Sequence, residues 1–274
     1  MAVAAELLAS ERHARVGGAR IAYREAGAGA PVLLLHGIGS AAASWREQLA
    51  GLAGRFRLIA WDAPGYGGSG DVAKDYPVPA DYADLALGLL DDLGIERCHL
   101  VGHSLGGLVA ASVARRHAAR LLSLTLSAPA AGFGAKPGGT WPAPVQERLD
   151  DLAALGSEGM AAKRAHRVCA PDARAEVIAE ARAIMGRVRA RGYGQASALL
   201  AQGDILADAP WIAVRTLVLV GAADVIAPVE RCRAVAAAIP HARFEVLPGV
   251  GHASYLEDHE HYNGKLAAFM AGAA

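Results

Sequence analysis

Short runs of apolar residues recur along the chain, and most of them end in Gly, Pro, Asp or His. Within a run the apolar residues are continuous rather than alternating with polar ones, which is typical of strands covered on both faces. The runs predict strands in six ranges: 31–37, 57–65, 98–104, 124–129, 216–224 and 243–252. An earlier segment, 13–27, predicts an antiparallel hairpin joined to the same sheet.

Helical patterns lie between these runs. In 81–95, leucines recur every four residues from Leu85 to Leu93, Asp81 stands where an N-cap is expected, and Gly94 ends the pattern. Similar patterns occupy 105–118, 229–238 and 259–271. Strands alternating with helices predict an α/β fold with a mostly parallel central sheet flanked by helices.

The alternation breaks between residues 131 and 209. A Gly/Pro-rich stretch there is followed by segments that are helical in composition. We interpret this block as a helical lid inserted over the carboxyl edge of the sheet, where open α/β folds bind ligands. Ordinary crossover helices are the alternative. The predicted organisation is a core in two parts, 1–130 and 210–274, with the lid, 131–209, between them.

Composition narrows the class of protein. Hydrophobic residues make up 53% of the 274, enough for a large core, and 27 Lys and Arg residues balance 27 Asp and Glu residues. Without a basic stripe, a nucleic-acid partner is not expected. Three cysteines form no CxxC pair, the first ten residues lack the basic start of a signal peptide, and no apolar run is long enough to span a membrane. We therefore expect a cytoplasmic protein that does not bind membranes.

The segment Gly102-His103-Ser104-Leu105-Gly106 follows an apolar strand and precedes a helix of small residues. This G-x-S-x-G pattern is typical of a nucleophile at a sharp strand-to-helix turn, because glycines on both sides remove side chains that would collide there. The following helix also directs its positive N-terminus toward the serine. The sequence predicts Ser104 as a nucleophile; a tight structural turn is the alternative.

A serine hydroxyl needs a base to take its proton, and in this architecture the acid and the base follow the serine in that order. Asp224 and His252 each come just after a predicted strand. We predict that His252 accepts the Ser104 proton and that Asp224 orients the imidazole. Asp204 and Asp208, near the end of the block 131–209, are weaker candidates for the acid.

An acyl-transfer intermediate needs two N–H donors for its oxyanion. One is expected from Leu105, directly after the nucleophile, and the other from Ile38, in the glycine-containing loop after strand 31–37. A metal is not predicted. The histidines of the segment 258–261 are two residues apart, the wrong spacing for one helical face, so this segment reads as a polar helix start.

The chain resembles the α/β-hydrolase superfamily over nearly its whole length, in "PVLLLHGIGS", "WDAPGYGGSG", "VGHSLGG", "LVLVGAADVIAP" and "GVGHASYLED". Its length and inserted lid are similar to a group containing 3-oxoadipate enol-lactonases, small carboxylesterases and meta-cleavage-product hydrolases. The resemblance implies a triad of Ser104, Asp224 and His252 and no cofactor. Serine rather than aspartate at position 104 argues against haloalkane dehalogenases and epoxide hydrolases, and Ala253, where meta-cleavage-product hydrolases usually carry Trp, argues against carbon–carbon cleavage.

These observations predict a serine hydrolase that cleaves small carboxylic esters or lactones through an acyl-enzyme. Hydrolysis of meta-cleavage-type vinylogous diketones and a ligand receptor on the same fold are the alternatives. The partner is a small molecule, and a homo-oligomer is compatible with the sequence. For the substrate pocket we predict Gly37, His103, Trp45 and Trp141, with Tyr193 as a further candidate; packing of the lid against the core is the alternative role for the three large aromatic residues.

Overall fold

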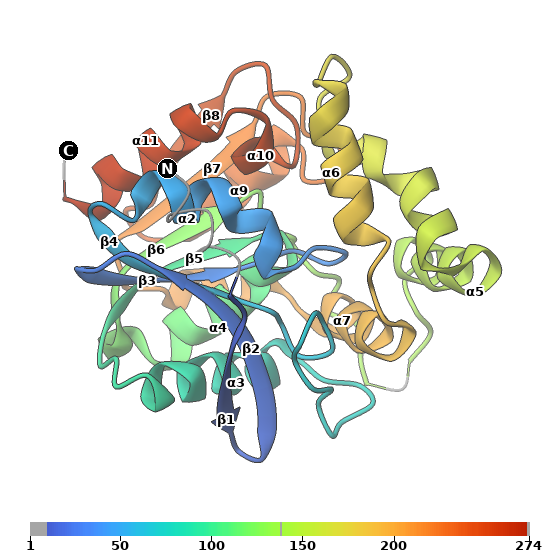
Figure 1. Ribbon diagram of the computed structural model, residues 1–274, viewed down its shortest axis with the longest axis horizontal. Coiled ribbons are helices and arrows are strands. Elements are labelled where there is room, and N and C mark those ends of the chain that lie inside the picture. Colours follow the sequence, from blue (N-terminus) through green and yellow to red (C-terminus); the bar gives the residue numbers. More distant parts are fainter. Residues whose placement is uncertain (1–9, 138, 273–274) are drawn as a thin grey trace.

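One eight-stranded sheet forms the centre of the computed structural model, which describes residues 10–137 and 139–272 (Figure 1). The prediction that the first ten residues do not form a signal peptide concerns residues that lie mostly outside this described part. The strand order is β1-β2-β4-β3-β5-β6-β7-β8, and only the pairings of β2 with β1 and with β4 are antiparallel. The strands are β1 (Arg12–Val16), β2 (Ala19–Ala26), β3 (Ala30–Leu35), β4 (Phe56–Trp61), β5 (Cys98–His103), β6 (Leu121–Ser127), β7 (Thr216–Gly221) and β8 (Arg243–Leu247).

Helices cover both faces of the sheet, and this explains the continuous apolar runs. In β3, Leu33 and Leu35 join one apolar cluster while Val32 and Leu34 join the other. The first cluster contains residues of α3 (Pro79–Asp92), α4 (Leu105–Arg116) and α9 (Val229–Ala238). The second contains residues of α2 (Arg46–Leu52) and α11 (His259–Met270). The predicted α/β architecture, a mostly parallel central sheet flanked by helices, is confirmed.

A helical insert connects β6 to β7 and lies at one side of the sheet (Figure 1). It contains α5 (Ala143–Arg164), α6 (Ala175–Met185), α7 (Ala190–Gln202) and α8 (Ile205–Asp208). Arg189 holds its α7 end to the core by donating to the carbonyl oxygens of Gly67 and Ser69, both at 2.7 Å. Gln195 adds a 2.8 Å hydrogen bond to the carbonyl of Val72.

Several predicted boundaries differ from the structure, among them the start of α3 and the end of the last strand. Helix α3 starts at Pro79, because proline is favoured in the first turn of a helix, where its missing N–H is not needed. Asp81 is therefore not the N-cap; its carboxylate accepts from the Val78 N–H at 2.9 Å from inside the first turn. The last strand ends at Leu247, and residues 248–253 form a loop.

The three cysteines are buried and unpaired, and burial raises the pKa of Cys98 to about 12, so its thiol stays protonated. Within residues 10–137 and 139–272, no helix is both long and apolar enough to cross a membrane.

His99 makes the stability of this fold depend on pH. Burial, with a smaller contribution from the charge of Arg215, lowers the pKa of His99 to about 4, and Ser123 Oγ lies 2.8 Å from its Nδ1. A histidine in the unfolded chain has a pKa of about 6.5. Between these values only the unfolded chain binds the proton, so stability should fall as pH drops from about 6.5 to about 4.

The loss attributed to His99 is on the order of 3 kcal/mol, and urea unfolding at pH 7 and pH 4.5 measures most of it. His36 and His103 are also buried with lowered pKa values and act in the same direction. For this reason the comparison is between the wild type and His99→Gln, which should lose less stability over the same interval. Equal losses would show that His99 is not responsible.

Candidate active site

Ser104 lies at a sharp turn between β5 and α4, in a backbone conformation that is unusual for a residue with a side chain (φ 51°, ψ −114°). Two neighbouring glycines make the turn sterically possible. A Cβ added to Gly102 would lie 2.3 Å from the Gly106 carbonyl oxygen, and one added to Gly106 would lie 2.3 Å from that of Leu35. The elbow therefore needs glycine because the strand and the helix touch through their backbones.

Asp224 and His252 come together from the loops after β7 and β8. His252 Nδ1 lies 2.7 Å from Asp224 Oδ2, and both side chains are buried. The other carboxylate oxygen accepts from the N–H groups of Ile226, at 2.7 Å, and Ala227, at 2.8 Å. A carboxylate held this way accepts from Nδ1–H, which leaves Nε2 of the imidazole unprotonated and able to accept a proton.

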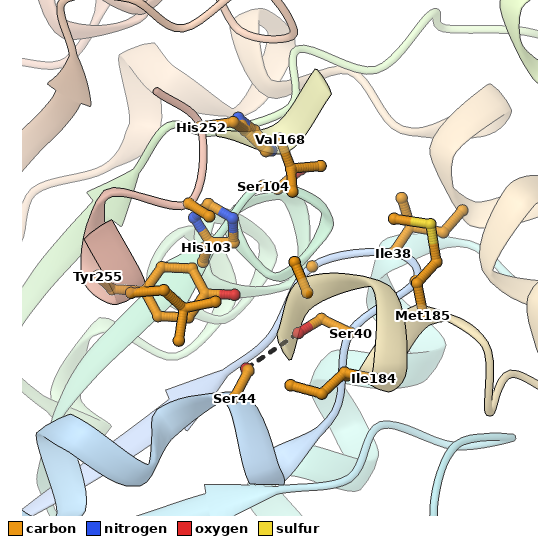
Figure 2. A pocket seen from close by; sticks show the side chains of 15 residues that line it. Ile38, Ser40, Ser44, His103, Ser104, Val168, Ile184, Met185, His252 and Tyr255 are labelled. Carbon is orange, nitrogen blue, oxygen red and sulfur yellow. Dashed lines mark hydrogen bonds between the residues drawn. The ribbon is translucent and has the colours of Figure 1, made fainter. Parts of the chain in front are cut away.

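Ser104 and His252 line the same cavity (Figure 2). The lining residues are Gly37, Ile38, Gly39, Ser40, Ser44, His103, Ser104, Val168, Ala181, Ile184, Met185, His252, Ala253, Tyr255 and Leu256. Helix α6 of the insert supplies three of them, so it forms one wall. The cavity volume is about 40 Å³, which exceeds the roughly 10–15 Å³ that a cavity needs to hold one water molecule. In this conformation the cavity admits only small groups.

His36 orients the loop that was predicted to supply an oxyanion donor. Its Nε2 accepts from the Ala63 N–H at 2.9 Å, so its Nδ1 carries the proton and donates to the Gly37 carbonyl at 2.8 Å. The Gly37 carbonyl and the Ile38 N–H belong to one planar peptide group and point in opposite directions. Fixing that carbonyl therefore fixes the direction of the Ile38 N–H. Ile38 lines the cavity, and Leu105 is the first residue of α4, directly after Ser104.

His103 lies against the His252 ring, with ring centroids 4.7 Å apart. Burial, with the nearby charge of a protonated His252, holds the pKa of His103 well below its usual range. His103 is therefore a neutral neighbour of His252. It lines the cavity as predicted, and so does Gly37.

The predicted aromatic pocket residues lie elsewhere. Trp45 is fully buried and packs against the Tyr255 ring, 4.6 Å between centroids, behind the cavity wall. Trp141 contacts Tyr76, 5.9 Å between centroids, and Tyr193 is buried in the first apolar cluster, together with residues of α3 and α4. None of the three predicted aromatic side chains lines the described cavity. They pack the core and the insert because large aromatic rings bury the most apolar area.

Glu257, which sequence analysis did not single out, joins the loop of His252 to the insert. One carboxylate oxygen accepts from the Gly251 N–H at 2.9 Å and the other from the Ala170 N–H at 2.7 Å. The Ala253 N–H also donates to the Val168 carbonyl at 2.6 Å. These three hydrogen bonds, named here the Glu257 clip, hold the residues on both sides of His252 against the insert.

The competing acidic candidates have structural roles. Asp204 caps α8 by accepting from the N–H groups of Leu206 and Ala207, and Asp208 forms a 2.6 Å ion pair with Arg115. Asp258 accepts from the His261 N–H at the start of α11. In the part of the chain that the structure describes, no cluster of three His, Cys, Asp or Glu side chains has the arrangement of a metal site.

Comparison with known proteins identifies the family. A family model described as alpha/beta hydrolase fold matches residues 30–259. The chain belongs to the α/β-hydrolase family. A relative from Stutzerimonas stutzeri named "Putative carbamate hydrolase RutD" is 32% identical over 268 residues, covering 88% of this chain and 92% of its own.

Solved structures agree with this family. The enol-lactonase of Burkholderia xenovorans is 26% identical, with a TM-score of 0.85, and the alignment covers 95% of this chain and all of that one. A thermophilic esterase from Thermogutta terrifontis is 27% identical, with a TM-score of 0.86 over 97% of this chain and 99% of its own. The predicted superfamily is confirmed.

Proposed function

We propose that the protein is a serine hydrolase of small carboxylic esters or lactones. The observation that carries this proposal is the His252 ring, held by Asp224 at 2.7 Å, in the same cavity as Ser104. That arrangement supplies a nucleophile, a base and a group that sets the tautomer of the base. The small volume of the cavity favours short acyl groups.

In the proposed reaction, Ser104 Oγ attacks the carbonyl carbon while His252 Nε2 takes its proton. The negative oxygen accepts from the N–H groups of Ile38 and Leu105. His252 then gives the proton to the leaving alcohol, and the bond from the carbonyl carbon to that alcohol breaks. Water releases the acyl group in a second cycle with His252 again as base.

The family relatives favour hydrolysis, because an enol-lactonase and an esterase share the fold at more than 25% identity. The name of the Stutzerimonas relative adds carbamates as a second candidate class, since attack on a carbamate carbonyl needs the same groups. We further propose that the helical insert acts as a lid, because α6 forms a wall of the cavity.

The test is hydrolysis of p-nitrophenyl acetate and butyrate, a γ-lactone, a phenyl carbamate and a meta-cleavage dienoate. Many turnovers per protein molecule on an ester or the lactone are expected. A single stoichiometric release of p-nitrophenol would contradict the proposal and favour a receptor. Turnover of the dienoate alone or of the carbamate alone would contradict ester and lactone hydrolysis and would assign that compound's class as the substrate.

Glu257→Gln is expected to lower both stability and activity. The glutamine amide keeps one acceptor oxygen, so either Gly251 or Ala170 loses its partner, and an unsatisfied buried N–H costs about 1–3 kcal/mol. We expect a loss of stability of that size in urea unfolding, with kcat/KM for p-nitrophenyl butyrate reduced about tenfold because the His252 loop is less well held. Glu260→Gln, on the exposed face of α11, is the control. Equal effects of the two substitutions would argue against the clip.

A further inference from the structure

Three hydroxyl groups lie together on one wall of the cavity. They belong to Ser40, Ser44 and Tyr255, and we call them the hydroxyl cluster. Ser40 Oγ donates to Ser44 Oγ at 2.9 Å, and Ser44 Oγ donates to the Ala41 carbonyl at 2.8 Å. The Tyr255 hydroxyl lies close enough to both serines for them to lower its pKa, and Figure 2 shows it directed toward them.

The cluster is rigid. Ser44 is fully buried, and the Tyr255 ring packs between those of Trp45 and His103, with centroid distances of 4.6 Å and 4.8 Å. Gln48 Nε2 also donates to the Tyr255 carbonyl at 3.0 Å. The hydroxyls therefore keep their positions when a ligand enters.

The serine side chains are not needed to hold the turn that carries them. In Ser-Ala-Ala-Ala-Ser, residues 40–44, the Ala42 N–H donates to the Asp62 carboxylate at 2.8 Å and the Ser44 N–H donates to the Ala41 carbonyl at 3.0 Å. These backbone bonds would be the same with alanine at both ends. The neighbouring cavity residues Ile184, Met185 and Leu256 are apolar. A few polar side chains among apolar ones are typical of groups that orient a ligand.

The hydrogen-bond inventory of the cluster limits what it can bind. The Ala41 carbonyl can only accept, so the Ser44 proton is committed to it, and one further hydroxyl suffices to donate to Ser44 Oγ. The remaining proton, from Ser40 or Tyr255, is available to a ligand acceptor. Burial raises the pKa of Tyr255, so its phenol stays protonated and able to donate.

A carboxylate is a poor ligand for this wall. Among the described residues that line the cavity, none is lysine or arginine, and a buried anion without a cationic partner is strongly disfavoured. A neutral ether, hydroxyl, carbonyl or amide group needs only one hydrogen bond. Such a group matches the cluster.

We propose that Ser40, Ser44 and Tyr255 form a specificity site that selects esters or lactones carrying an uncharged hydrogen-bonding group near the reacting carbonyl. This inference rests on the proposed hydrolase function and narrows its substrate class. Neither alkyl esters nor those with a second, ionised carboxylate are then the best substrates.

The test compares esters of equal shape. p-Nitrophenyl methoxyacetate is matched with the butyrate, and the 3-methoxypropionate with the pentanoate, each rate being divided by that of hydroxide hydrolysis of the same ester. One neutral hydrogen bond should raise kcat/KM for the ether ester about three- to tenfold in at least one pair. Tyr255→Phe and Ser40→Ala/Ser44→Ala should bring that ratio close to one. Tyr262→Phe removes a buried phenol hydroxyl that does not line the cavity and should leave the ratio unchanged.

Binding to Ser104→Ala separates this inference from the proposed function. Methyl methoxyacetate and methyl butyrate should bind this variant with the same three- to tenfold difference in Kd, lost when Tyr255→Phe is added. If the wild type hydrolyses no ester but the binding difference remains, the proposed function fails and the specificity site stands. A ratio of ether-ester to alkyl-ester kcat/KM near one in the wild type would overturn the specificity site. So would a ratio that stays unchanged in both cluster variants. A higher kcat/KM for the p-nitrophenyl hemisuccinate than for the pentanoate would also overturn it.

Discussion

Replacing Ser104 with alanine should reduce kcat for p-nitrophenyl butyrate by roughly 10⁴-fold or more, because the proposed mechanism forms the acyl-enzyme on its hydroxyl. The residual rate would come from the oxyanion donors and from binding. Stopped-flow measurement at pH 8 with matched protein concentrations gives the ratio. Retention of more than a tenth of the activity would show that Ser104 is not the nucleophile.

Ser104→Gly provides a control for the backbone. It should be as inactive as Ser104→Ala, but it should be more stable by about 1 kcal/mol. Glycine adopts a positive φ of 51° without the usual penalty of about 1–3 kcal/mol, although its unfolded chain has more entropy to lose. Urea unfolding of the two variants tests this order. A less stable glycine variant would mean that the elbow is not strained.

Asp224→Asn should lower kcat by about 10⁴-fold with little change in the fold. The asparagine oxygen would keep accepting from the N–H groups of Ile226 and Ala227, so its NH₂ group would face His252 Nδ1. Nδ1 must then be the acceptor, and the ring proton moves to Nε2. In that tautomer His252 cannot take a proton from Ser104.

Asp208→Asn is the matched control, because Asp208 is another acidic side chain but is paired with Arg115 at 2.6 Å outside the cavity. Its kcat should stay within about twofold, as expected for loss of one largely exposed ion pair. Measured kcat values for both variants decide between the two acids. A loss at Asp208 equal to that at Asp224 would contradict the assignment.

Sequence analysis reached the fold because the signals for it are local. The continuous run of β3 predicts a strand covered on both faces, and its alternate leucines do lie in two different apolar clusters. Glycines at 102 and 106 likewise predict a close contact, which the structure has at 2.3 Å from an added Cβ. Asp224 and His252 were predicted to lie together because each follows a strand and parallel strands end at one edge of the sheet, and the structure pairs them at 2.7 Å.

The cavity walls were harder to predict, because they depend on contacts between segments distant in the chain. Trp45 was chosen for its size, yet its ring lies behind Tyr255. Val168 and Met185 belong to the insert, whose helices carry no motif that fixes their position. Ser40 and Ser44 had a detectable signal, since only these residues of 40–44 are polar. Glu257 had no such signal in the sequence, because it binds the backbone N–H groups of Gly251 and Ala170, which every residue except proline carries.

The Glu257 clip has a consequence for the passage of ligands. Because Val168 and Ala170 are bonded to the loop of His252, the insert cannot move away on that side without breaking these hydrogen bonds or displacing His252. We expect ligands to enter the cavity through local rearrangement of α6, where Met185 has an unbranched, flexible side chain. We therefore expect His252 and Asp224 to stay paired while a ligand enters, and larger ligands to bind more slowly than small ones.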